Sequence, residues 1–190
     1  VTLGILAAIV AVNTISSGRW SESAAKANQE KGTAYAWYQS KSIKESIIEG
    51  HRDSVLALLK SSDAKGTYKA ALETDLEKLN KTLERYSKEK KEILIGSSGV
   101  GESNWSIVHK GALGQIKGAQ EWEQDLAVYN EAGDIFDMSA MFLQLSMVLG
   151  SISLLLNRKS VRNGFFNGMF GMGVVGTYYL TQAYTIVGGF

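Results

Sequence analysis

The stretch MSAMFLQLSMVLGSISLLL, residues 138–156, contains no charged residue and decides the class of fold. An α-helix rises about 1.5 Å per residue, so about 20 apolar residues cross the hydrocarbon core of a bilayer. Residues 138–156 are therefore expected to form a transmembrane helix.

Two other segments share this lack of charge, residues 1–17 and residues 164–190. The first is short for a span, and we expect its start to be truncated at Val1. The last segment carries Tyr178, Tyr179 and Tyr184 towards its end, where aromatic rings suit a membrane interface. The sequence thus predicts three transmembrane helices, with residues 157–163 as a basic turn between the second and the third.

The composition favours helices and excludes several kinds of chemistry. The 190 residues include no proline, which breaks helix interiors, and no cysteine, so disulfides and thiolate sites are excluded. The net charge of +1 gives no electrostatic footprint for nucleic acid. We therefore expect an all-α protein that binds no nucleic acid.

The polar region, residues 18–137, is predicted to be an extramembrane stalk. Apolar residues in residues 69–93 alternate steps of four and three, as the seam of a coiled coil requires. A second seam begins at Val108, Ala112 and Gln115 and keeps its register into residues 138–156, which predicts one continuous helix over residues 103–156. With hinges near residues 61–66 and 96–103, the stalk is expected to be a long helical hairpin or coiled coil.

Charged residues near the spans predict the orientation. Arg158, Lys159 and Arg162 make the short turn basic, which places that turn in the cytoplasm by the positive-inside rule. Arg19 and Lys26, beside the first span, oppose this orientation. The sequence favours a stalk on the side of the membrane away from the cytoplasm.

The run AYAWYQSKSIKESIIE, residues 34–49, follows the first span and precedes long charged helices and a C-terminal pair of spans. In this run and in the layout of its spans the chain resembles a bacterial membrane-protein family, domain of unknown function 4337. The resemblance supports the topology and implies a bacterial inner membrane with the stalk on its periplasmic side. It implies no activity.

The run GSSGVGES, residues 96–103, is one letter from a phosphate-binding loop. That loop needs a lysine where Glu102 stands, and it needs a strand before it and a helix after it. We therefore interpret the run as a hinge between helices, with Ser98 or Ser103 as an N-cap, and expect no bound nucleotide.

The run GMGVVG, residues 171–176, matches a dinucleotide-binding pattern but lies inside an uncharged span. Small residues let membrane helices approach closely, so helix packing is the better interpretation, against the second span or another subunit. The predicted transmembrane packing residues are Ser146, Gly150, Gly164, Gly168, Gly173 and Gly176.

The remaining candidates for chemistry are two histidines and a set of aromatic residues. His51 and His109 have no ligand set at helical spacing, so no metal or other cofactor is predicted. Aromatic residues in the stalk either pack within it or dock another protein. The candidate partner contacts are Tyr35, Trp37, Tyr38, Trp105 and Trp122.

Two classes of function remain at this stage, and neither is enzymatic. The first is a non-catalytic, membrane-anchored accessory or scaffold subunit, whose spans and stalk contact other integral membrane subunits or further copies of the chain. The second is a membrane sensor module, although the short basic turn leaves no room for an output domain.

Overall fold

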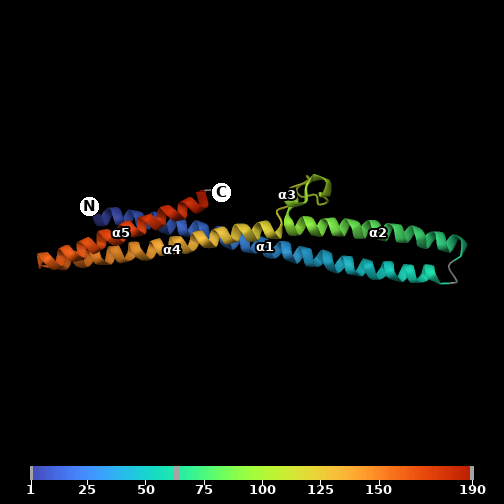
Figure 1. Ribbon diagram of the computed structural model, residues 1–190, viewed down its shortest axis with the longest axis horizontal. Coiled ribbons are helices and arrows are strands. Elements are labelled where there is room, and N and C mark those ends of the chain that lie inside the picture. The colour runs from blue at the N-terminus through green and yellow to red at the C-terminus, as the bar shows by residue number, and fades with distance from the viewer. Residues whose placement is uncertain (1, 62–64, 189–190) are drawn as a thin grey trace. The chain divides into compact units, whose positions relative to one another are not determined.

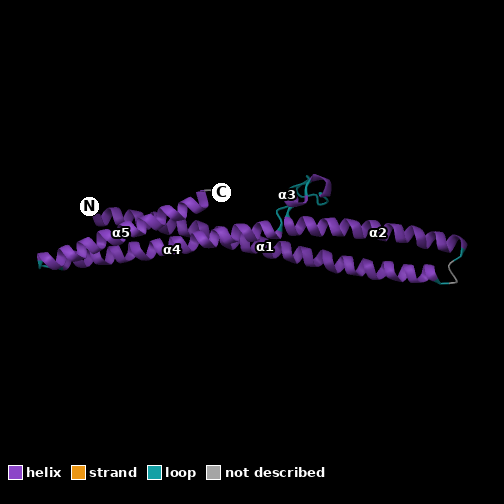
Figure 2. Ribbon diagram, in the orientation of Figure 1, coloured by secondary structure: helices purple, strands orange, loops and turns teal. Residues whose placement is uncertain are grey.

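The computed structural model describes residues 2–61 and 65–188, and in these residues it contains helices and no strand (Figures 1 and 2). The predicted all-α class is therefore confirmed. The elements are α1 Thr2–Lys60, α2 Gly66–Ile95, α3 Ser97–Val100, the 3-10 helix η1 Glu102–Asn104, α4 Ala119–Leu155 and α5 Lys159–Gly188.

The chain divides into two compact units. One comprises Val1–Ala27 and Gln124–Phe190 and is called the apolar unit; the other, Asn28–Glu123, is called the hairpin unit. The long helices α1 and α4 each contribute to both units. Each unit is described separately below.

In the apolar unit, α4 and α5 run antiparallel, and the first part of α1 lies beside them (Figure 1). Phe136 and Leu143 of α4 are fully buried against α5, in two clusters that also contain Leu180 and Met169. Leu6 brings α1 into the second cluster. The unit is therefore a three-helix bundle with a narrow interior.

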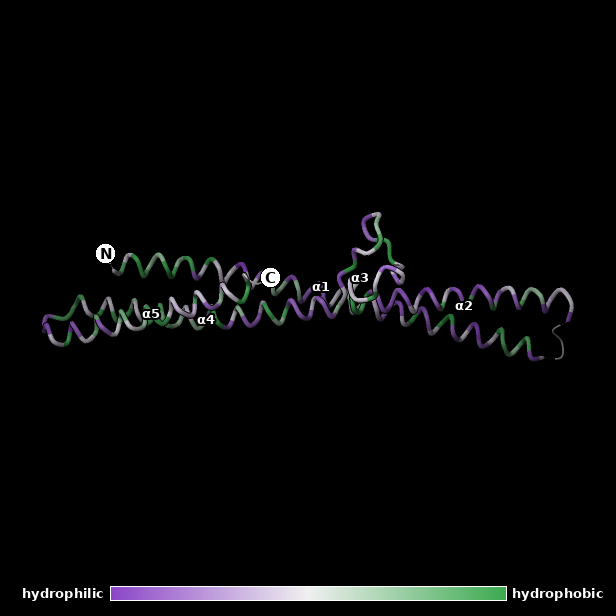
Figure 3. Tube along the Cα trace, turned by 45° about the horizontal axis from the view of Figure 1, so that its top comes forward, coloured by the Kyte–Doolittle hydropathy of each residue, from purple (hydrophilic) through white to green (hydrophobic). Residues whose placement is uncertain are grey.

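Two described helices, α1 and α4, are long and apolar enough to cross a membrane. Figure 3 shows hydrophobic residues recurring along the first part of α1, along α4 and along α5, whereas α2 carries long hydrophilic stretches. The third predicted span, in α5, is not one of these two helices, and its apolar residues are interspersed with glycine, tyrosine and threonine.

In the hairpin unit, the second part of α1 runs alongside α2 (Figure 1). Val55 of α1 packs with Leu72 and Leu79 of α2, two members of the predicted seam. Lys90, a charged residue at the spacing of that seam, forms an ion pair with Glu45 of α1. The charged residue at this position therefore makes a polar contact between the two helices of the hairpin unit.

The continuous helix predicted over residues 103–156 is wrong. Helix α4 begins at Ala119, and residues 105–118 form a loop with one tight turn, in which His109 and Ala112 exchange backbone hydrogen bonds. The physical reason is a series of glycines with positive φ, a conformation that costs other residues energy. These are Gly96, Gly101, Gly111 and Gly114.

The other two connections lie close to their predicted positions. α1 ends at Lys60 and α2 begins at Gly66, and residues 62–64 of the predicted hinge lie outside the described residues. The predicted basic turn is too long, because α5 already begins at Lys159 and only residues 156–158 are non-helical.

Candidate functional site

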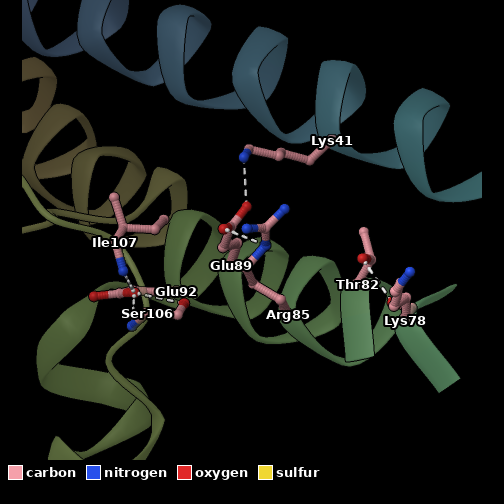
Figure 4. A network of polar contacts seen from close by, with 8 residues as sticks. All are labelled: Lys41, Lys78, Thr82, Arg85, Glu89, Glu92, Ser106 and Ile107. Atoms are coloured by element: carbon pink, nitrogen blue, oxygen red, sulfur yellow. Dashed lines mark hydrogen bonds and ion pairs between the residues drawn. The ribbon is translucent and has the colours of Figure 1, made fainter. Parts of the chain in front are cut away.

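The loop of residues 96–118 is organised by the buried carboxylate of Glu92, on the last turn of α2. One carboxylate oxygen accepts the backbone N–H groups of Ser106 and Ile107, at 2.8 and 3.0 Å, and the Ser106 hydroxyl at 3.1 Å (Figure 4). The other oxygen accepts the Ser97 hydroxyl at 2.8 Å. Four donors thus compensate the desolvation of a carboxylate that is fully buried.

The same contacts occupy backbone N–H groups in and just after residues 96–103, the near match to a phosphate-binding loop. Such a loop offers free backbone N–H groups to the anion. Here the N–H of Ser97 donates to the carbonyl of Ile116 at 2.8 Å, and those of Ser106 and Ile107 donate to Glu92. Glu102 lies exposed in η1.

The start of α4 is held against the same loop by Glu121. Its carboxylate accepts the N–H of Gly118 at 2.8 Å, as a glutamate three positions into a helix often does, and also accepts the Ser98 hydroxyl. A Cβ on Gly118 would lie 2.1 Å from the backbone nitrogen of Gly96. The two chain segments therefore approach so closely that position 118 requires glycine.

Two of the five candidate partner contacts pack against the loop. Tyr35 and Tyr38 lie half-buried on a cluster that includes Ile107 and Ile116, and the Tyr35 hydroxyl donates to Glu123 at 3.4 Å. Their rings are therefore used inside the hairpin unit.

The three tryptophans among these candidates lie in different environments. Trp105 donates its indole N–H to the carbonyl of Ser97 at 2.8 Å, and its ring fills the space beside Gly114. Trp122 lies beneath the ammonium of Lys117, 4.3 Å from its ring centre. Trp37 is exposed on α1 and, of the five, is best placed to contact a partner.

Residues 34–49 supply the polar contacts between α1 and α2. Lys41 pairs with Glu89, which Arg85 of α2 also approaches, at 3.6 Å (Figure 4). Glu45 pairs with Lys90. Lys41 and Glu45 of this run therefore help to fix how the two helices of the hairpin unit pair.

The predicted packing residues lie largely at helix contacts in the apolar unit. Ser146 of α4 donates to the carbonyl of Met169 at 2.6 Å. A Cβ would lie 2.6 Å from Met169 at Gly150, 2.9 Å from Leu6 at Gly173 and 2.7 Å from Leu143 at Gly176. At Gly168 it would meet Leu149 at an ordinary 3.4 Å, and at Gly164 nothing lies within 4 Å.

Further polar groups point into the apolar unit. Ser139 donates to the carbonyl of Gly176 at 2.8 Å, and Ser16 shares a hydrogen bond with Tyr184. Asn13, which is 1% exposed, donates to the carbonyl of Phe136 at 3.3 Å, while its own Oδ1 has no partner. The interior of this unit is therefore narrow and partly polar.

The outside of the apolar unit is apolar. A groove of about 490 Å³ between α1 and α5 is lined mainly by apolar side chains, among them Ile5, Phe170 and Val174. Large apolar side chains are exposed along all three helices, among them Ile15, Met141, Leu145, Val148, Ile152 and Tyr178. A water-soluble helical bundle would instead carry mainly polar residues on its outer surface.

The described residues contain no group of three or more His, Cys, Asp or Glu side chains that could hold a metal ion. His51 is exposed on α1, and His109 is exposed in the tight turn of the loop. The structure does not bring the two histidines into such a group.

The residues that sequence reasoning missed are Glu92 and Glu121. The sequence does contain a signal for the loop that they hold. Gly111, Gly114 and Gly118 follow the glycines of residues 96–101 and together indicate a longer loop. The pattern Gly118-x-x-Glu121 also indicates a helix start. Neither pattern indicates which carboxylate lies inside the loop.

Fold and site together define an all-helical protein with a charged hairpin and a separate three-helix unit. A family model described as domain of unknown function (DUF4337) matches residues 1–186, and the chain belongs to this family. The resemblance carried by residues 34–49 is thereby confirmed. No curated protein and no solved structure matches the chain.

Proposed function

We propose that this protein is a non-catalytic, membrane-anchored helical scaffold: three helices of the apolar unit cross the bilayer, and the hairpin unit stands outside it. The observation that carries the proposal is the apolar outer surface of the apolar unit. Large apolar side chains face outward on all three helices, and the hydroxyl groups of Ser139 and Ser146 face inward. Hydrocarbon is the solvent that suits such a surface.

The length of the charge-free band supports the same proposal. In α4 this band extends from Met138 to the end of the helix at Leu155 and corresponds to about 27 Å of helix. Asp137 lies at one end of the band, and the basic group that begins at Arg158 lies at the other. The hydrocarbon core is about 30 Å thick, so a band of this length suits a span.

A scaffold function is favoured because the polar side chains of the hairpin unit are used to hold its own fold. Glu92 holds the loop, and the pairs Lys41–Glu89 and Glu45–Lys90 hold the helices together. What the unit offers outward is helix surface and a rigid loop with exposed Val108 and Leu113. We propose that these surfaces, and the outer faces of the spans, contact other membrane subunits.

The test of the membrane part uses single cysteines, because the chain contains no cysteine of its own. Ser61→Cys lies at the end of α1 in the hairpin unit, and Asn157→Cys lies in the connection between α4 and α5. For a hairpin on the periplasmic side of a bacterial inner membrane, a membrane-impermeant maleimide labels Ser61→Cys in intact cells. Asn157→Cys is labelled only after lysis.

Equal labelling of both variants in intact cells, or release of the protein from membranes by alkaline carbonate, would contradict the membrane proposal. The scaffold part is tested by mild detergent extraction and native mass spectrometry, where we expect a constant partner subunit. A complex containing this chain alone, whose thermal stability rises with added small ligands, would instead support a sensor.

A further inference from the structure

The buried side chain of Asn13, in the apolar unit, carries an acceptor that no group of the described chain reaches. Its Nδ2 donates to the carbonyl of Phe136 at 3.3 Å, whereas its Oδ1 accepts no hydrogen bond from the residues that the structure describes. A carbonyl oxygen can only accept, so the nitrogen of the amide must face Phe136 and Oδ1 is the atom left over. A buried acceptor without a donor is costly, so a donor is expected at this point.

One turn along α1, a pair of hydroxyl groups has a hydrogen available for a further bond. The hydroxyls of Ser16 and Tyr184 share one hydrogen bond, in which only one of the two donates. The accepting hydroxyl keeps its own hydrogen, which is free to be donated elsewhere. This pair therefore has the donor that the amide oxygen of Asn13 lacks.

These groups belong to one cluster inside the apolar unit. Ser16 follows Asn13 by three residues, a spacing that places two side chains on the same face of a helix. The rings of Phe136 and Tyr184 meet edge to face, with their centres 5.6 Å apart. Since Asn13 binds Phe136 and Ser16 binds Tyr184, the unpaired acceptor and the available hydrogen lie around the same point.

A polar groove between α1 and α4 lies one helical turn from this cluster. It has a volume of about 250 Å³, and Ser17 and Asp137 are among the residues that line it. Ser17 follows Asn13 by four residues, and Asp137 follows Phe136 directly. Water enters a groove with hydroxyl and carboxylate walls, so a source of water lies within one turn of Asn13.

We propose that a water molecule binds inside the apolar unit at Asn13, where it donates to Oδ1 and accepts the available hydrogen of the Ser16–Tyr184 pair. Buried waters make about two to four hydrogen bonds, and these two tie Asn13 to the contact between α1 and α5. The inference goes beyond the proposed function and does not rest on it, because Asn13 is enclosed by the helices of the unit itself.

The chemistry of the cluster favours water over a cation or a larger molecule. A hard cation takes about six or more oxygen ligands, whereas the cluster offers one neutral amide oxygen and a pair of hydroxyls. Asn13 and Ser16 are both buried, which leaves no room for a larger ligand. A water molecule donates and accepts at once, as the two groups require.

Nuclear Overhauser effects between water and the full-length chain in detergent micelles test this inference. The amide protons of the Asn13 side chain are observed, and Asn13→Leu assigns their signals by loss. Ala183, fully buried in the same unit, is the dry control, and Asn130, exposed in the polar groove, is the wet control. We expect the water cross-peak of the Asn13 amide to be at least about fivefold stronger than that of the Ala183 methyl group.

Two variants separate a bound water from a direct contact between the hydroxyl pair and Oδ1. In the proposed arrangement, Ser16→Ala and Tyr184→Phe each leave one hydroxyl to donate to the water, so the cross-peak is retained in both. A hydroxyl that donated to Oδ1 directly would take the cross-peak with it when removed. Circular dichroism checks that each variant keeps its helices.

The cross-peak is recorded in the laboratory frame and in the rotating frame, because opposite signs identify a bound water and equal signs identify proton exchange. Three results would overturn the inference: an Asn13 cross-peak no stronger than that of Ala183, equal signs in the two frames, or loss of the cross-peak in Ser16→Ala or Tyr184→Phe. The first two are measured on the unaltered chain, so they hold even where a variant does not fold.

Discussion

The apolar unit and the hairpin unit solve the same problem, packing helices side by side, with opposite placements of polarity. In the apolar unit, glycine and serine lie between helices and large apolar side chains lie outside. In the hairpin unit, partly buried ion pairs and tyrosines lie between helices, and charged residues cover α2. If the proposed membrane insertion is right, the difference teaches that helix contacts follow the solvent: close packing of small residues suits hydrocarbon, whereas apolar seams suit water.

Glu92→Ala tests the most polar interior contact and has the largest expected effect. The substitution leaves the N–H groups of Ser106 and Ile107 without their acceptor, at an expected cost of about 3 kcal/mol to the loop. Hydrogen-exchange mass spectrometry should show that residues 103–118 exchange about a hundredfold faster.

The matched control is Glu102→Ala, which removes an exposed carboxylate from the same loop. It is expected to leave exchange unchanged. Equal rates in the two variants would show that the buried carboxylate does not hold the loop.

Gly176→Ala tests close packing in the apolar unit. Its Cβ would meet the fully buried Leu143 at 2.7 Å, so we expect it to destabilise the unit by about 2 kcal/mol relative to Gly171→Ala. The control position lies on the same helix and has nothing within 4 Å, so both variants share the gain in helix propensity.

The measurement is unfolding in detergent micelles, followed by circular dichroism. Unfolding of Gly176→Ala and Gly171→Ala at the same detergent concentration would contradict this expectation. It would show that α4 and α5 pack equally well with a methyl group at position 176.

Lys41→Ala and Lys81→Ala compare an inner and an outer ion pair of the hairpin unit. Lys41 and Glu89 are less than a fifth exposed, so losing this pair is expected to cost about 1 kcal/mol. Lys81 and Glu77 are fully exposed to solvent and should contribute nothing measurable. Urea unfolding of both variants measures the two losses of unfolding free energy. A larger loss for Lys81→Ala than for Lys41→Ala would contradict the expectation.

The ion pair of Lys81 and Glu77 should be detectable in the titration of Glu77, even though its effect on the free energy of unfolding is small. The hydrogen bond from Lys81 and its charge lower the pKa of Glu77 below the ordinary value of 4.5. A lowered pKa in the folded state gives stability that is present above the unfolded pKa and lost as the pH falls through the folded pKa. Carboxyl NMR titration should show that Lys81→Ala raises the pKa of Glu77.

Much of the fold could be predicted from the sequence because helix signals are local. The absence of proline and the apolar positions of α2 indicate helices without knowledge of the fold. Gly173 and Gly176 likewise indicated close packing, since only a small residue allows the contact they make with Leu6 and Leu143. The roles of Tyr35 and Tyr38 could not be assigned in this way, because packing and docking use the same residue types.

The sequence by itself determined the helical class and the charge-free segments, because each depends on residues close together in the chain. Only the tertiary structure decided the loop after α2. Val108, Ala112 and Ala119 follow the spacing of a helix seam, yet the contacts that prevent a helix join Glu92 to Ile107 and Ser97 to Ile116. Such contacts are 15 and 19 residues apart in the chain, and a pattern of neighbouring residues carries no information about them.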